Sequence, residues 1–182
     1  MADVIEYEKT YLCAKFPGEF VTGEPDRMID VYVPEAAHHP KLRLRFRGGR
    51  YEITKKAPID TDASQQLEQT IPLMKDEFDE LATVSNRRVE KLRFSLLYNG
   101  FVGELDVFSG EHAGLILVDF EFEDVESMER FSKPDFCSED VSNEVMVAGG
   151  LLSGLGRDEL FASLSDKYGY MPVDTSELIK NV

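Results

Sequence analysis

Hydrophobic and polar residues alternate along much of this 182-residue chain. Successive side chains of a β-strand point to opposite faces of a sheet, so alternation predicts strands with one apolar and one polar face. The clearest alternating segments are residues 5–12, 41–47, 50–56, 66–73, 91–98, 101–108 and 115–124, and residues 27–34 show a weaker pattern. The pattern therefore predicts an antiparallel sheet of seven or eight strands.

Turn residues between these segments support the same interpretation. Gly48-Gly49 separates two of the segments, and Asn99-Gly100 separates another two. Two-residue linkers of this composition are typical of tight β-hairpins. Residues 109–114 predict a longer hairpin loop, in which we expect His112 to be exposed to solvent.

Apolar residues at helical spacing are rarer. Residues 75–90 and 158–168 show them clearly, and Gly169 is well placed to end the second helix. Shorter helices are expected at residues 126–131, 143–152 and 174–177. Strands and helices together predict one α+β domain that covers residues 1–182.

Composition and charge exclude several classes of partner. The chain has 35 acidic and 20 basic residues, a formal net charge of −15, which repels nucleic acids and anionic membranes. Cys13 and Cys137 are too few for a disulfide framework and are expected as buried thiols. The uncharged run from Val145 to Gly156 is too short to span a bilayer, which takes about 20 residues. The first residues contain no apolar signal segment, so we expect a cytoplasmic protein.

The charged residues on the alternating strands are sorted by sign. Bases gather on some strands (Arg43 and Arg45; Lys91 and Arg93) and acids on others (Glu6 and Glu8; Glu104 and Asp106; Asp119 and Glu121). Alternation alone does not say which face is inside, and a solvated charged face around an apolar interior fits it as well. If the charged face is inside, it forms a basic wall opposite an acidic wall. Such a lumen suits a polyanion bridged by a divalent cation.

Short charged motifs follow one another in a definite order between residues 6 and 142. They are Glu6-Tyr7-Glu8-Lys9, Arg43 with Arg45, Ile53-Thr54-Lys55-Lys56, Glu68, Lys91-Leu92-Arg93-Phe94, Glu104 with Asp106, Asp119-Phe120-Glu121 and Glu139-Asp140-Val141-Ser142. This series resembles the CYTH superfamily, or triphosphate tunnel metalloenzymes. That superfamily includes thiamine triphosphatases, inorganic triphosphatases and class IV adenylate cyclases.

The resemblance implies an eight-stranded antiparallel β-tunnel, closed as a barrel, with a charged lumen, helices packed outside and the segment from about residue 143 as a cover or plug. It implies metal-dependent hydrolysis of an inorganic or organic triphosphate, and it is compatible with a homodimer. The implied substrate-binding residues are Arg43, Arg45, Lys56, Lys91 and Arg93. The implied ligands of Mg²⁺ or Mn²⁺ are Glu6, Glu8, Glu68, Glu104, Asp106, Asp119 and Glu121. The implied catalytic residues are Glu6, Glu8 and Lys56.

Some positions depart from the pattern of the superfamily. Thr10 stands where a lysine is expected, Thr70 replaces a glutamate and Gln66 an arginine. These differences leave open a second function, a binding module of the same fold that does not turn over its ligand. A more distant alternative is a lipocalin-like carrier whose apolar faces line the interior.

Overall fold

The computed structural model describes residues 7–59 and 62–180, and for residues 56–59 and 62–68 it describes the backbone alone. Nine strands form one antiparallel sheet in the order β5-β4-β3-β2-β6-β7-β8-β1-β9. The strands are β1 (Tyr7–Cys13), β2 (Val21–Val33), β3 (Leu42–Arg47), β4 (Arg50–Ile59), β5 (Asp62–Leu73), β6 (Arg88–Tyr98), β7 (Phe101–Phe108), β8 (Ile116–Phe122) and β9 (Cys137–Asp140). The predicted antiparallel sheet is thereby confirmed.

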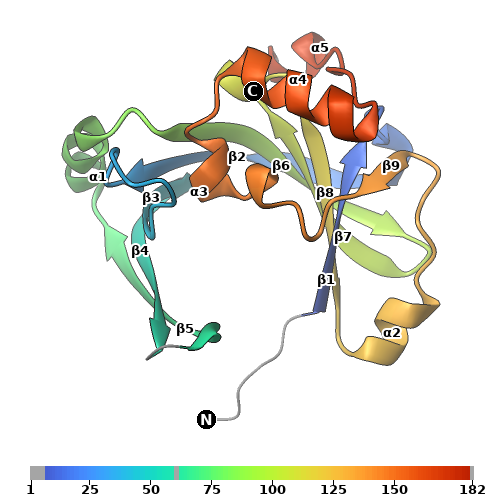
Figure 1. The fold of residues 1–182 in the computed structure, drawn as a ribbon, viewed down its shortest axis with the longest axis horizontal. Coiled ribbons are helices and arrows are strands. Elements are labelled where there is room, and N and C mark those ends of the chain that lie inside the picture. Colours follow the sequence, from blue (N-terminus) through green and yellow to red (C-terminus); the bar gives the residue numbers. More distant parts are fainter. Residues whose placement is uncertain (1–6, 60–61, 181–182) are drawn as a thin grey trace.

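The sheet curves strongly but is not closed by hydrogen bonds. Its two edge strands, β5 and β9, do not pair with each other in the described part of the chain, so a closed barrel is not confirmed. In Figure 1 the strands β3–β5 form one arm of an arch and β7, β8 and β1 form the other. The sequence predicted seven or eight strands, and the structure describes nine. The additional strand is β9, which has only four residues, too few to show alternation.

The two short hairpins have the expected turns. Gly48 and Gly49 have φ of 53° and 86°, and Asn99 and Gly100 have φ of 49° and 86°. Positive φ at both central residues is the requirement of a type I′ turn, which glycine and asparagine meet at low cost.

The helices are short and lie between or after the strands. They are α1 (Lys75–Leu81), α2 (Val125–Arg130), α3 (Gly149–Leu152), α4 (Arg157–Tyr168) and α5 (Ser176–Ile179), with 3₁₀ turns at Gly18–Phe20, Ala82–Val84, Gly110–His112 and Val145–Val147. Gly169 ends α4 with φ of 66°, as expected. The helix expected over residues 75–90 was too long: Val89 belongs to β6, where it pairs with β2 and packs beside Phe108 and Leu117.

Apolar side chains gather in two clusters on one face of the sheet and in a third cluster on the other face. On the first face Leu92, Leu105 and Phe120 join a cluster with Phe131 and Phe136. On the second face Leu12, Phe108 and Leu117 pack under Leu152, Leu160 and Leu164 from α3 and α4. Charged side chains lie beside this cluster on the same face, on the inside of the arch. Among the described residues, no helix combines the length and the apolar character that a membrane crossing requires.

His112 is buried rather than exposed, which corrects the expectation from its hairpin. Its side chain is 2% exposed, and Nε2 lies 2.9 Å from the carbonyl oxygen of Leu152 and 3.3 Å from that of Leu155. Burial lowers the pKa of the imidazole, which favours the neutral ring, and its N–H can donate to these carbonyls. The histidine therefore attaches the β7–β8 loop to the end of α3.

Candidate functional site

A cavity of about 510 Å³ opens on the inner face of the arch. Its lining includes nine of the residues expected to bind substrate or metal: Glu8, Arg43, Arg45, Lys91, Arg93, Glu104, Asp106, Asp119 and Glu121. The segment after residue 143 also contributes, through Glu144, Val147, Ala148, Gly149 and Leu152. Arg43 and Glu104 thus face a common space, and the ionic lining contradicts the lipocalin-like alternative.

Three expected site residues cannot be placed at the level of side chains. Glu6 lies outside the described residues. Lys56 and Glu68 stand opposite each other in the pairing of β4 with β5, but their side chains lie outside the description. Their roles remain predictions.

The basic wall begins with Arg45, which faces Asp30 across β2 and β3. Arg45 Nε donates to Oδ1 and Nη2 to Oδ2 of Asp30, both at 2.7 Å. Burial lowers the pKa of Arg45, but the hydrogen bonds and charge of Asp30 outweigh burial and raise it overall. Arg45 is therefore held as a fixed cation in the cavity wall.

Asp106 joins the two bases of β6 at the centre of the cavity. Arg93 Nε and Nη2 donate to its two oxygens at 2.7 Å each, and Lys91 Nζ also contacts it. Burial favours the protonated form of Asp106, but Lys91 and Arg93 outweigh burial and hold its pKa below the ordinary value. Arg93 also contacts Glu104. The hydrogen bonds and the charge of Asp106 outweigh burial and raise the pKa of Arg93 above its ordinary value.

Arg43 differs from the other bases of the cavity. Among described side chains, its Nε is the buried polar atom that has no hydrogen-bond partner. A buried N–H without an acceptor is costly, and a charged one more so. Its neighbour Tyr32, opposite on β2, has a pKa raised to about 12, chiefly by burial. Arg43 therefore lines the cavity with one donor, Nε, that has no protein acceptor.

Acidic side chains face each other on β7, β8 and β1. The register places Glu8 opposite Glu121, and Asp119 opposite Glu104. Like charges in such positions repel each other. Burial, with the charges of Asp106 and Glu8, raises the pKa of Asp119 to about 7. A proton or a cation at this wall would relieve the repulsion.

The donor set of this wall fits a hard divalent cation, because Mg²⁺ and Mn²⁺ prefer carboxylate oxygens. As the side chains lie, no three acidic, histidine or cysteine residues in the described ranges form a ready-made metal cluster. Binding would therefore require changes of side-chain rotamer. Glu8 and Glu121 are exposed enough to make such changes.

Sequence reasoning missed several cavity residues. Asp30 and Tyr32 point to the charged face of β2, and their alternation with Ile29 and Val31 was a usable signal. Glu144 lies just before the 3₁₀ turn Val145–Val147; the single helix expected over residues 143–152 is instead this turn followed by α3. Oε2 of Glu144 accepts a hydrogen bond from Tyr168 at 2.8 Å and contacts Lys167, which attaches α4 to the cavity wall.

Two of the departures from the expected motifs also have defined surroundings. Thr10 lines the cavity, and its Oγ1 donates to Glu8 at 3.2 Å. Thr70 lies on β5, where its hydroxyl is 2.9 Å from that of Thr54. A lysine was expected at position 10. The threonine that stands there instead donates a hydrogen bond to Glu8 and so orients this acidic side chain.

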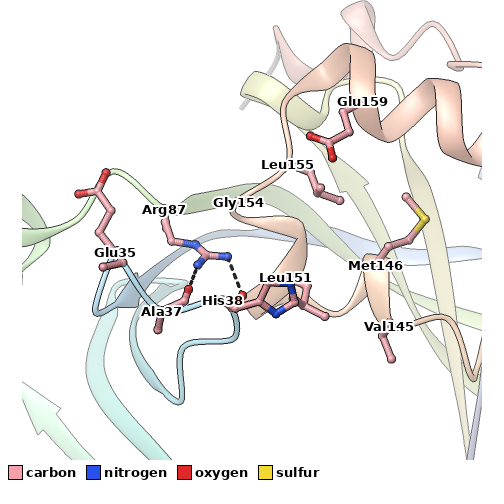
Figure 2. Close-up of a pocket in the computed structure, with 11 residues that line it drawn as sticks. Glu35, Ala37, His38, Arg87, Val145, Met146, Leu151, Gly154, Leu155 and Glu159 are labelled. Carbon is pink, nitrogen blue, oxygen red and sulfur yellow. Dashed lines mark hydrogen bonds between the residues drawn. The ribbon is translucent and has the colours of Figure 1, made fainter.

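A second, wider hollow of about 750 Å³ lies beside the cavity, between the β2–β3 loop and the α3–α4 segment. Figure 2 shows Arg87 reaching the carbonyl oxygens of Ala37 and His38. Arg87 also donates to the carbonyl oxygen of Gly150 at 2.8 Å and to Ser153 Oγ at 3.3 Å. Its guanidinium is thus occupied by protein acceptors and holds α3 in place at the edge of the charged cavity.

Comparisons with known proteins agree with this geometry. No protein-family model matches the chain. It is 33% identical over 141 residues to an inorganic triphosphatase of Nitrosomonas europaea. This alignment covers 76% of this chain and 90% of that protein. It is 36% identical over 56 residues to an inorganic triphosphatase of Acetivibrio thermocellus, covering 31% of this chain and 35% of that one.

A solved structure gives the same result at the level of the fold. The crystal structure of an inorganic triphosphatase superposes with a TM-score of 0.66 and 29% identity, over 85% of this chain and 98% of the other. The long alignment and the inward-facing charged strands lead to one conclusion: this chain belongs to the CYTH superfamily of triphosphate tunnel metalloenzymes.

Proposed function

We propose that this protein hydrolyses inorganic triphosphate in the charged cavity. The observation that carries the proposal is one space of about 510 Å³ lined both by bases of β3 and β6 and by acids of β7, β8 and β1, in which Arg43 Nε has no hydrogen-bond partner. The similarity to the inorganic triphosphatase of Nitrosomonas europaea supports the same reaction and substrate.

The bases of β3 and β6 would bind the phosphate oxygens. Arginine matches two oxygens at once and lysine acts as a point charge, so Arg43, Arg93 and Lys91 together provide both kinds of contact. Lys56 would extend this set from β4. An incoming triphosphate would compete with Asp30 and Asp106 for the guanidinium groups that these acids now hold.

The acidic wall would hold Mg²⁺ or Mn²⁺ through Glu8, Glu104, Asp119 and Glu121, with Glu6 and Glu68 as further proposed ligands. Bound there, the cation would offset phosphate charge and polarise water for attack on the terminal phosphorus. Glu6, Glu8 and Lys56 remain the proposed catalytic residues. Because carboxylates bind cations in the ionised form, the raised pKa of Asp119 means that cation binding releases a proton near neutral pH.

A second candidate function is triphosphate binding without turnover. Two observations favour it: Asp30 already holds Arg45 through both oxygens, and Thr10 stands where a base was expected. This function would require the same cavity and the same anion but no chemical step.

A phosphate-release panel separates the two functions. Tripolyphosphate, thiamine triphosphate and ATP would each be tested with Mg²⁺, with Mn²⁺ and with chelator. We expect metal-dependent release, fastest from tripolyphosphate. Calorimetric binding of tripolyphosphate without release would instead establish the binding module.

A matched pair of variants connects the activity to the cavity. Arg43→Gln removes the free donor, and Arg130→Gln removes an exposed arginine of α2 as the control. A hydrogen bond to a charged group contributes about 1.5–3 kcal/mol, so Arg43→Gln should lower kcat/KM about 10- to 100-fold. Equal values for Arg43→Gln and the parent would contradict the proposal.

A further inference from the structure

The two cysteines of the chain, Cys13 and Cys137, stand opposite each other where β1 pairs with the edge strand β9. They are 0% and 4% exposed, and both belong to the apolar cluster of Phe131 and Phe136. Neither cysteine lines the charged cavity, so the proposed reaction makes no use of them. Both are free thiols, and the fold brings them together from distant parts of the chain.

The backbone at this pair of residues suits a disulfide. The amide of Cys137 donates to the carbonyl oxygen of Pro134 at 3.0 Å. The carbonyl oxygen of Cys13 accepts from the Tyr170 hydroxyl at 3.2 Å. The two cysteines therefore do not exchange backbone hydrogen bonds with each other, and at such positions of an antiparallel pair the Cα atoms lie about 4.5 Å apart. Disulfides join Cα atoms separated by about 4.4–6.8 Å, so a bond here requires no shift of the strands.

The reactivity of the pair depends on the opening of β9. A hydrogen bond with the Cys137 thiol, together with burial, raises the pKa of Cys13, so this thiol is protonated at neutral pH. An oxidant therefore reacts only when β9 detaches for a short time. The strand is suited to such local opening because it has four residues, lies at an edge of the sheet and pairs with β1 through a register shift between Tyr11 and Cys13.

We propose that Cys13 and Cys137 form an intrachain disulfide when the protein meets a peroxide, and that this bond fixes β9 to β1. The sulfur of Cys137, on the strand that detaches, first attacks an oxygen of hydrogen peroxide; the O–O bond breaks, a sulfenic acid forms and one water leaves. The sulfur of Cys13 then attacks the sulfenic sulfur, which forms the S–S bond and releases a second water. The two thiols together lose two electrons and two protons, and the peroxide is reduced to water.

The disulfide would also hold part of the cavity wall in place. Directly after β9, the Val141 amide donates to the carbonyl oxygen of Thr10 at 2.8 Å, and Ser142 Oγ accepts from the Thr10 amide at 3.0 Å. Thr10, Val141 and Ser142 all line the charged cavity. Opening of β9 pulls on these contacts, so a bond between β9 and β1 would keep this wall closed. The inference does not depend on the reaction proposed for the cavity.

The test treats the full chain with hydrogen peroxide at mildly alkaline pH, in urea below the unfolding transition, and then removes both reagents. We expect the intact mass to fall by two hydrogen atoms and the thiols that react with a maleimide in denaturant to fall from two to none. Because the closed loop runs from residue 13 to residue 137, the disulfide should raise Tm by roughly 5–15 °C, and dithiothreitol should reverse the rise. The Val141 amide should exchange with solvent at least about 10-fold more slowly in the oxidised protein.

Cys137→Ser and Cys13→Ser are the matched controls, since each keeps one thiol and should show no rise of Tm after the same treatment. A rise of equal size in either variant would overturn the proposal. So would two free thiols in the treated parent, a gain of oxygen atoms alone, or a disulfide between two chains on a non-reducing gel. A disulfide that leaves the exchange of the Val141 amide unchanged would overturn the fixing of β9. The mass and thiol count of the parent decide the result even if a variant does not fold.

Discussion

Replacement of Asp106 by asparagine would break the ionic network at the centre of the cavity. Asp106→Asn keeps the shape of the side chain but removes the charge that Lys91 and Arg93 share. The side chains of Lys91, Arg93 and Asp106 are only 11%, 13% and 3% exposed. The variant would therefore leave two bases in a poorly hydrated site without their main partner.

The expected cost follows from this burial. Removal of one partner from a buried ion pair costs roughly 3–5 kcal/mol. For a chain of this size each kcal/mol lowers Tm by about 2–4 °C, so Asp106→Asn should lower Tm by roughly 6–20 °C. The control Asp166→Asn, on the exposed side of α4, should change Tm by less than about 2 °C.

Thermal unfolding with chelator at neutral pH measures this cost, and tripolyphosphate provides a second readout. A ligand at 100 times its Kd stabilises by about 2.7 kcal/mol. Because the unpaired bases of Asp106→Asn gain more from an anion, tripolyphosphate should raise the Tm of the variant more than that of the parent. A Tm equal to that of the parent, or an identical ligand shift in both proteins, would refute the reasoning.

Three further predictions concern the surroundings of the cavity. Asp119→Asn should stabilise the metal-free protein by an amount that grows from pH 4 to pH 7. The reason is that Asp119 keeps its proton in the folded chain up to a pKa of about 7, whereas in the unfolded chain it releases the proton at a pKa near 3.8. Thermal scans that show the same difference in stability at every pH would contradict this. Arg87→Ala should lower the urea unfolding free energy by roughly 1–3 kcal/mol because it frees α3, and an unchanged midpoint would argue against this role. Tyr170→Phe removes the hydroxyl that accepts a hydrogen bond from the buried Ile116 amide at 3.0 Å. The amide hydrogen of Ile116 should then exchange faster with solvent, and the free energy of unfolding should fall by roughly 1–3 kcal/mol. An unchanged exchange rate would show that the contact is dispensable.

Local patterns were sufficient to predict the strands, the tight turns and the ionic faces. Gly48-Gly49 and Asn99-Gly100 specify their turns through positive φ, which few other residues adopt readily. Strict alternation places Arg43 and Glu104 on the same faces as the other charged residues of their strands, and both line the cavity. Alternation did not show whether the charged face of the sheet points inward or outward. That prediction required the resemblance to a family.

Features that depend on distant contacts could not be predicted in this way. The burial of His112 results from α3, which lies 40 residues later in the chain. Val89 satisfies a helical spacing, yet pairing with β2 assigns it to a strand. Closure of the sheet would require its two edge strands, β5 and β9, to pair with each other. Those strands are far apart in the chain, so no local sequence pattern predicts whether they pair.

A crystal structure of the protein with tripolyphosphate would test the central claim most directly. We expect the ligand inside the arch, with phosphate oxygens within hydrogen-bond distance of Arg43 Nε and of the Arg93 guanidinium. Tripolyphosphate bound at another surface, with the charged cavity free of ligand, would contradict the account.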